Sequence, residues 1–205
     1  MFKKLFDIFK DKNRQTAEDI RKEIDVLQRV DEVITSTTYY CYENTLSLMK
    51  IEKEDMDFQI ELYYEYLYLF RHLILRQAFT QLPFVQMKIL HEYVAGTCTP
   101  LAVNTFLKRY PEIAGNQRYA AFYYKQFFSK IDEMEVYLSA SREIIGDDKA
   151  LLSKFGNKVV GLAGGSADSS LSGMVIHLIT YAYQSMKIDE IIEQAKRDIF
   201  AKIAQ

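Results

Sequence analysis

The sequence predicts an all-α protein, an elongated bundle of about seven helices that run mostly antiparallel. Three observations predict this class. Apolar residues recur at steps of three and four along almost the whole chain, which is the period of a helix with one buried face. Proline and glycine number only 3 and 8 and fall mainly between these runs, where helices begin and end. One run, 116–145, would form a helix of roughly 45 Å, so we expect the bundle to be elongated.

The first half of the chain contains two long predicted helices. Thr16 is a suitable N-cap for a helix that runs to about Met49, and acidic residues follow in its first turn. Within it, 35–42 is rich in β-forming residues, but helical flanks and the lack of turn residues favour a helix there as well. The second helix should run from about Asp55 to Leu82. Apolar residues on several of its faces predict that it is central.

The second half divides into shorter predicted elements. Pro83 begins a helix that should end at Gly96, and Thr99 with Pro100 begins another that ends near Tyr110. The remaining elements are helices over 116–145 and 148–155, a glycine-rich loop at 156–165, a helix to about Met186 and a last helix from about Asp189.

The composition is that of a soluble protein with one domain. The 205 residues suffice for one buried core, and 26 basic against 28 acidic residues exclude a strongly basic nucleic-acid binder. Two distant cysteines, no secretory signal and no stretch apolar enough to cross a membrane predict a cytoplasmic location. We divide the chain into an N-terminal amphipathic helix, 1–14, and a single helical-bundle domain, 15–205.

The sequence lacks the common motifs for metal binding and nucleophilic catalysis. The residues three positions before the histidines are Leu69, Lys88 and Met174, so the Glu-x-x-His pairs of di-iron bundles are missing. No His-Glu-x-x-His, Gly-x-Ser-x-Gly or Walker-type sequence occurs either. The sequence therefore predicts no metal and no cofactor, and it favours a protein that is not an enzyme.

The first dozen residues form a candidate contact segment with an apolar face and a basic surround, made by Phe2, Lys3, Lys4, Leu5, Phe6 and Phe9. Residues 1–14 carry a net charge of +3 in a chain whose total is −2. Such a helix is typical of one that lies weakly on an anionic membrane surface or docks into a partner's groove. The alternative is a terminal helix that folds back onto its own bundle.

A second candidate is the glycine-rich segment 161–170, which precedes a predicted helix. Backbone N–H groups there, with a helix dipole behind them, would suit an anion, and the candidate residues are Gly164, Gly165, Ser166 and Ser169. The sequence Gly-Leu-Ala-Gly-Gly-Ser-Ala-Asp-Ser-Ser resembles the phosphate-binding loop of the small-molecule kinases that include mevalonate and diphosphocytidyl-methylerythritol kinases. The resemblance implies phosphate binding and an α/β fold with strands before the loop. Long predicted helices stand there instead, and the small residues alternatively allow tight turns and close helix packing.

The third candidate is a polar stripe on the second long helix, formed by Glu61, Glu65, Tyr68, His72 and Arg76. Steps of four, three, four and four place these residues on one face. Two carboxylates and a histidine in a polar groove could act as acid and base. The alternative is a solvated helix face, which the like charges of Glu61 and Glu65 one turn apart favour.

These features favour a non-enzymatic interaction or scaffold protein that self-associates or docks a protein partner. It would be peripheral to the inner membrane surface if its N-terminal helix binds lipid. The alternative is a phosphate-ligand-binding protein or small enzyme that uses the segment 161–170. The sequence identifies no particular small-molecule ligand.

Overall fold

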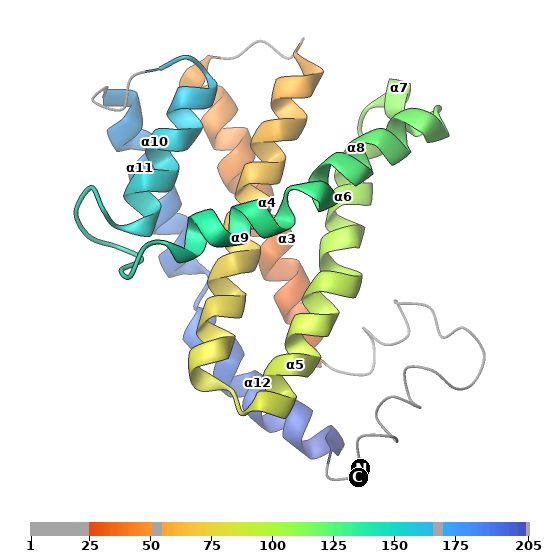
Figure 1. Ribbon diagram of the computed structural model, residues 1–205, viewed down its shortest axis with the longest axis vertical. Coiled ribbons are helices and arrows are strands. Elements are labelled where there is room, and N and C mark those ends of the chain that lie inside the picture. The colour runs from red at the N-terminus through yellow and green to blue at the C-terminus, as the bar shows by residue number, and fades with distance from the viewer. Residues whose placement is uncertain (1–24, 51–54, 166–169, 204–205) are drawn as a thin grey trace.

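The computed structural model describes residues 25–50, 55–165 and 170–203 and confirms the predicted all-α bundle (Figure 1). Its helices are α3 (Asp25–Met49), α4 (Met56–Gln81), α5 (Phe84–Tyr93), the π-helical segment η1 (Val94–Cys98), α6 (Thr99–Leu107), α7 (Pro111–Ala114), α8 (Gln117–Ser129), α9 (Ile131–Ser139), α10 (Leu151–Leu162), α11 (Ser170–Ser185) and α12 (Ile188–Ile203). The predicted boundary between 14 and 15, like the start of the first helix at Thr16, lies outside the described residues.

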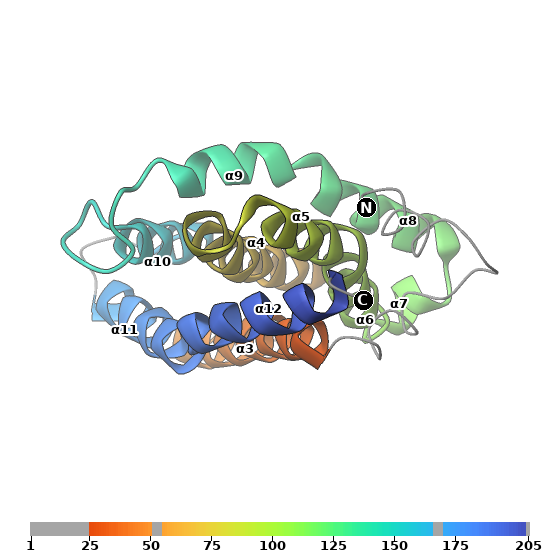
Figure 2. The same cartoon turned by 90° about the horizontal axis from the view of Figure 1, so that it is seen from below.

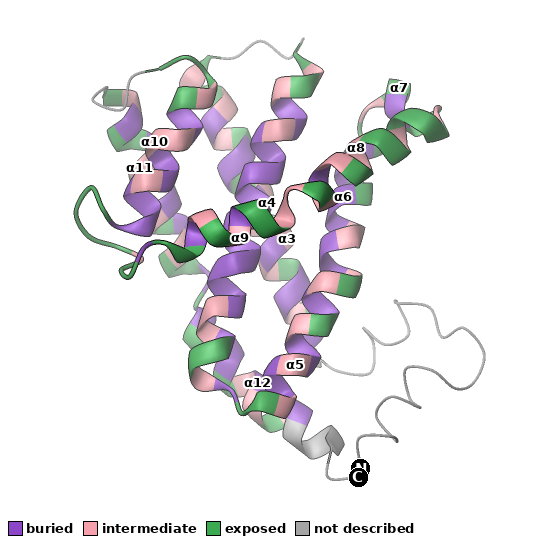
Figure 3. Cartoon of the chain, viewed as in Figure 1, coloured by how far each residue is buried: buried purple, intermediate pink, exposed green. Residues whose placement is uncertain are grey.

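The helices are arranged in layers around α4. In the view from below, α8 and α9 form an outer layer over α4, α5 and α10, and α3, α11 and α12 lie on the opposite side (Figure 2). The central position predicted for α4 is confirmed, because nearly every residue from Gln59 to Leu75 is buried (Figure 3). Asp55 is the N-cap of this helix, and its side chain accepts a hydrogen bond from the Phe58 backbone N–H at 2.9 Å.

The segment 35–42 is helical as predicted, within α3. Its β-branched residues are accommodated because that helix packs against α4, α11 and α12, and tertiary packing outweighs the modest difference in local propensity. The same packing buries the two threonine side chains of Thr38 and Thr45.

The predicted break at Gly96 is wrong, because α5, η1 and α6 form one continuous rod. Pro100 has no N–H, and its ring would crowd the carbonyl four residues earlier in a regular α-helix. A π-helical turn over Val94–Cys98 widens the helix at this point. The hydroxyl of Thr99 donates to the Val94 carbonyl at 2.7 Å, so Thr99 stabilises the turn rather than capping a new helix.

The single helix predicted over 116–145 is instead two helices that end early. Lys130 separates α8 from α9, and α9 ends at Ser139. Two backbone bonds, from Leu151 to Glu143 and from Leu152 to Ile144, hold the next segment as a loop. Arg76 of α4 also donates to the carbonyls of Ser141 and Arg142, so these two groups have partners without a further helix.

The loop predicted at 156–165 is mostly helix. α10 covers Leu151–Leu162, which also replaces the short helix predicted at 148–155. Gly156 lies at the contact of α10 with α11, where an added Cβ would come within 2.5 Å of Ile176 Cγ1. Its small size therefore allows the two helices to approach closely.

Candidate functional site

The structure describes the three predicted sites to different extents. Phe2, Lys3, Lys4, Leu5, Phe6 and Phe9 lie outside the described residues. So do Ser166 and Ser169, but Gly164 and Gly165 are described. The N–H of Gly164 donates to the Gly161 carbonyl and that of Gly165 to the Val160 carbonyl, both at 3.0 Å. These two N–H groups thus complete the C-terminal end of α10, and Gly164 has the positive φ, 74°, that such an end favours.

The polar stripe of α4 is not a solvated face. Glu65, Tyr68 and His72 are buried, whereas Glu61 and Arg76 are half-buried. Helix α9 crosses over this side of α4 (Figure 1), and the C-terminal part of α8 contacts it through Phe127. The solvated alternative is therefore wrong, because a segment distant in sequence covers the stripe.

The first half of the stripe is sealed. The Tyr68 hydroxyl donates to the Phe127 carbonyl at 2.6 Å, and Lys158 Nζ lies 2.6 Å from Glu65 Oε2. The remaining cavity beside Glu61 and Glu65 has a volume of only about 10 Å³. Burial raises the pKa of Glu65 even though Lys158 opposes this effect. This half of the stripe is a buried ion-paired contact between α4, α8 and α10.

The second half of the stripe opens into a cavity of about 740 Å³, which we call the Arg/His groove. Its polar and charged lining residues are Arg71, His72, Arg76, Thr80, His91, Asp132, Glu135, Ser139, Ser141 and Arg142, and Leu75, Phe79 and Ile131 are apolar. The structure therefore brings His72 and Arg76 into one groove and leaves Glu61, Glu65 and Tyr68 outside it.

A partly buried ion-pair network forms the floor of the Arg/His groove. Glu135 of α9 accepts from Arg71 Nη1 at 2.6 Å through one oxygen and lies 2.7 Å from His72 Nδ1 through the other. Burial opposes the charge of Glu135, but the hydrogen bond with His72 and the charge of Arg71 together lower its pKa. The carboxylate is thus held ionised between its two partners.

Arg76 lies beside this network and binds backbone oxygen atoms. Its Nη1 donates to the Ser141 carbonyl at 2.9 Å, and its Nη2 donates to the Arg142 carbonyl. These bonds attach the loop after α9 to α4 and give the groove its second wall.

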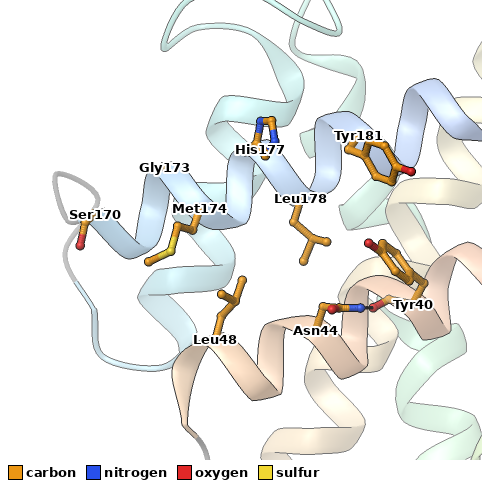
Figure 4. A pocket seen from close by; sticks show the side chains of 9 residues that line it. All are labelled: Tyr40, Asn44, Leu48, Ser170, Gly173, Met174, His177, Leu178 and Tyr181. Atoms are coloured by element: carbon orange, nitrogen blue, oxygen red, sulfur yellow. Dashed lines mark hydrogen bonds between the residues drawn. The ribbon is translucent and has the colours of Figure 1, made fainter.

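A second groove, which we call the α3/α11 groove, is shown in Figure 4. Its two helices lie on the side of the bundle opposite α9 (Figure 2). It has a volume of about 570 Å³ and is lined by Tyr40, Asn44, Leu48, Ser170, Gly173, Met174, His177, Leu178 and Tyr181. Tyr40 and Tyr181 lie opposite each other at one end, and Leu48 and Met174 at the other. The two helices are therefore antiparallel along the groove.

Helix α11 has two apolar faces. One face, with Val175, Ile179 and Ala182, is buried in the core. The other presents Met174 and Tyr181, which are 47% and 57% exposed, towards the groove. A surface helix ordinarily needs only one apolar stripe. Because Met174 and Tyr181 remain exposed, the second face is unpartnered among the described residues.

Sequence reasoning missed most of both grooves. Arg71 and Glu135 stand on different helices, and no local pattern pairs them. The second face of α11 did leave a signal, since Met174, His177, Leu178 and Tyr181 follow helical spacing beside the buried set.

Comparison with family models, with curated protein sequences and with solved structures finds no match for this chain.

Proposed function

We propose that this protein is a non-enzymatic interaction protein that self-associates, and that the α3/α11 groove of one copy receives the N-terminal segment 2–9 of a second copy. The observation that carries the proposal is the unpartnered apolar face of α11. Tyr40 on α3 is 43% exposed and continues this face across the groove. Exposed apolar surface gathered in one groove is typical of a protein-binding site.

The segment has the residue pattern and the length that a helix docked in this groove needs. Phe2, Leu5, Phe6 and Phe9 follow the i, i+3, i+4, i+7 pattern of a helix that docks its apolar face into a groove. As a helix, Phe2 to Phe9 would span about 11 Å, and Tyr40 to Leu48 along α3 span about 12 Å. The segment is therefore long enough to fill the groove.

The charges are also compatible. The described lining of the α3/α11 groove contains no Lys, Arg, Asp or Glu, so an uncharged aromatic face can be buried there without leaving an ion unpaired. On a helix, the charged residues of the segment would lie on its other face and stay in water. Residues 1–14 carry +3 in a chain of total −2, so the remainder of a second copy attracts the segment.

The chain is long enough to reach another copy. Fifteen residues, 10–24, connect Phe9 to the start of α3. Extended, they span up to about 50 Å, which exceeds the length of about 38 Å expected for the whole of α3. A copy placed beside the first is within this reach.

The test uses the full chain with benzoylphenylalanine in place of Phe6, cross-linked by light and analysed by mass spectrometry together with light scattering. We expect a dimer and intermolecular cross-links from position 6 to the α3/α11 groove. Met174→Glu, which puts a charge in the groove, and Phe6→Asp should each weaken dimerisation at least about tenfold. Val136→Glu, at a site 75% exposed on α9, is the matched control and should not change it.

A monomer at all concentrations overturns the proposal, and so do cross-links formed only within one chain. Binding of segment 1–14 to an anionic membrane is the competing use. None of the helices in the described part of the chain is long and apolar enough to cross a bilayer. Sedimentation with phosphatidylserine vesicles that depends on Phe6 but not on Met174 would favour surface binding and overturn the docking proposal.

A further inference from the structure

We propose that the Arg/His groove binds a small organic anion, with its carboxylate or phosphate head among the arginines and its apolar body against Phe79 and Leu75. The site is separate from the α3/α11 groove, so it does not depend on the proposed self-association. The argument rests on the charge of the groove, on two buried nitrogen atoms and on its size.

The groove has an excess of positive charge that its own residues do not neutralise. Three guanidinium groups line it against two carboxylates, Asp132 and Glu135. Both carboxylate oxygens of Glu135 are already bonded, one to Arg71 and the other to His72. Among the described residues, Arg76 bonds neutral backbone carbonyls instead of a carboxylate, so its charge remains available to an anion.

Two buried nitrogen atoms on lining residues have no hydrogen-bond partner within the described structure. They are Nε of Arg71 and Nε2 of His72, on residues that are each 4% exposed. Arg71 Nε always carries a hydrogen. Burying a donor without an acceptor costs free energy, so an oxygen-rich ligand that supplies an acceptor would be favoured.

The size and the walls of the groove favour an organic anion over an inorganic one. A volume of about 740 Å³ is in the range of small-molecule sites and exceeds what a bare phosphate needs. Leu75 is buried beside the charged floor, and Phe79 is 61% exposed. The Phe79 ring stands edge-on to His91 with centroids 6.4 Å apart, which gives the groove an aromatic wall. An aromatic or branched body would cover this exposed ring.

Calorimetric titration of the full chain with phenyl phosphate, phenylacetate and inorganic phosphate tests the proposal. We expect saturable binding of at least one of the two organic anions, at least about tenfold tighter than that of inorganic phosphate. Comparing phenyl phosphate with phenylacetate identifies the preferred head group. Arg76→Gln and Arg142→Gln should each weaken the binding at least about tenfold, because each removes one of the guanidinium charges that line the groove.

The matched control is Arg118→Gln, on the exposed side of α8 and outside the groove, which should leave the affinity unchanged. Arg142 is exposed, so its variant should remain folded, and thermal unfolding of each variant verifies this. Met174→Glu should also bind the anion normally, which separates this site from self-association. Absence of binding by both organic anions overturns the proposal. So does binding that Arg142→Gln does not weaken, or binding of inorganic phosphate as tight as that of the tighter-binding organic anion.

Discussion

The Arg/His groove and the α3/α11 groove have similar volumes, about 740 and 570 Å³, but opposite chemistry. The first is lined by arginines, histidines and carboxylates, and part of this lining comes from α9 and the loop after it. The second has no formal charge on its described lining and lies open between two antiparallel helices. The difference shows which conditions allow each kind of groove to form. Charges become buried only where a second segment supplies partners, whereas an apolar face can stay exposed on the helix that carries it.

The largest effect should come from detaching α8 from the polar stripe of α4. Phe127 is fully buried, and its ring stacks on Tyr68 with centroids 4.4 Å apart. Phe127→Ala should lower the free energy of unfolding by about 3–5 kcal/mol, because it leaves a cavity under α8. Urea denaturation followed by circular dichroism measures this loss. The control is Phe122→Ala on the same helix, 62% exposed, which should change stability by less than about 0.5 kcal/mol. Equal losses for the two variants would contradict the packing described.

A smaller, pH-dependent effect should come from the floor of the Arg/His groove. Glu135→Gln should cost roughly 2 kcal/mol at neutral pH, less than a fully buried pair costs, because the Glu135 side chain is 32% exposed. The folded protein lowers the pKa of Glu135, so its stabilisation is present above the unfolded pKa of about 4.3 and is lost as the pH falls through the folded value.

The difference in unfolding free energy between the native chain and Glu135→Gln should therefore shrink between pH 7 and pH 3. Urea midpoints across this range measure it. Glu133→Gln, exposed on the same helix, is the matched control and should show no such trend. A difference that grows as the pH falls would refute the ion pair with Arg71.

The packing of α10 on α11, which forms one wall of the α3/α11 groove, should be sensitive to a single added methyl group. In Gly156→Ala the new Cβ would come within 2.5 Å of Ile176 Cγ1, so the Ile176 side chain or the two helices must shift. We expect a loss of about 1 to 2 kcal/mol in thermal or urea unfolding. No measurable loss would mean that α11 is not packed closely on α10.

The smallest effect has the opposite sign. Gly173 lies on the groove face of α11 with nothing within 4 Å of an added Cβ. Gly173→Ala should stabilise the protein by about 0.5–1 kcal/mol, because alanine loses less backbone entropy than glycine in a helix. The same urea series measures the gain. Destabilisation would show that this face of α11 is already covered.

The sequence predicted best those regions whose structure depends on neighbouring residues. The apolar spacing defined both ends of α4 and the C-terminal end of α3 to within a few residues, since each turn carries the same pattern. The continuous rod at Gly96 was not predictable, because glycine and proline there suggest a boundary whereas the π-helical turn accommodates both. The end of α9 was not predictable either, since Arg76, more than sixty residues earlier, satisfies the loop that follows.

The candidate sites show the same limit. The spacing of the stripe residues placed all five on one face of α4, and they are Glu61, Glu65, Tyr68, His72 and Arg76. It could not show that Lys158 would pair with Glu65 and Glu135 with His72. The like charges of Glu61 and Glu65 suggested solvent. Lys158 and Lys130 provide the opposite charges instead, from elements that are distant in sequence.

The sequence by itself determined that this chain is helical, that α4 is central and that its polar residues share one stripe. The reason is that the helical period and the number of apolar faces can be read from the residues of each turn. Only the tertiary structure decided that α8 and α9 cover that stripe, that half of it closes around Glu65 and that the other half opens as the Arg/His groove. The physical reason is that the partner of a buried charge is chosen by the packing of whole helices, and the spacing within one helix carries no information about which helix will lie across it.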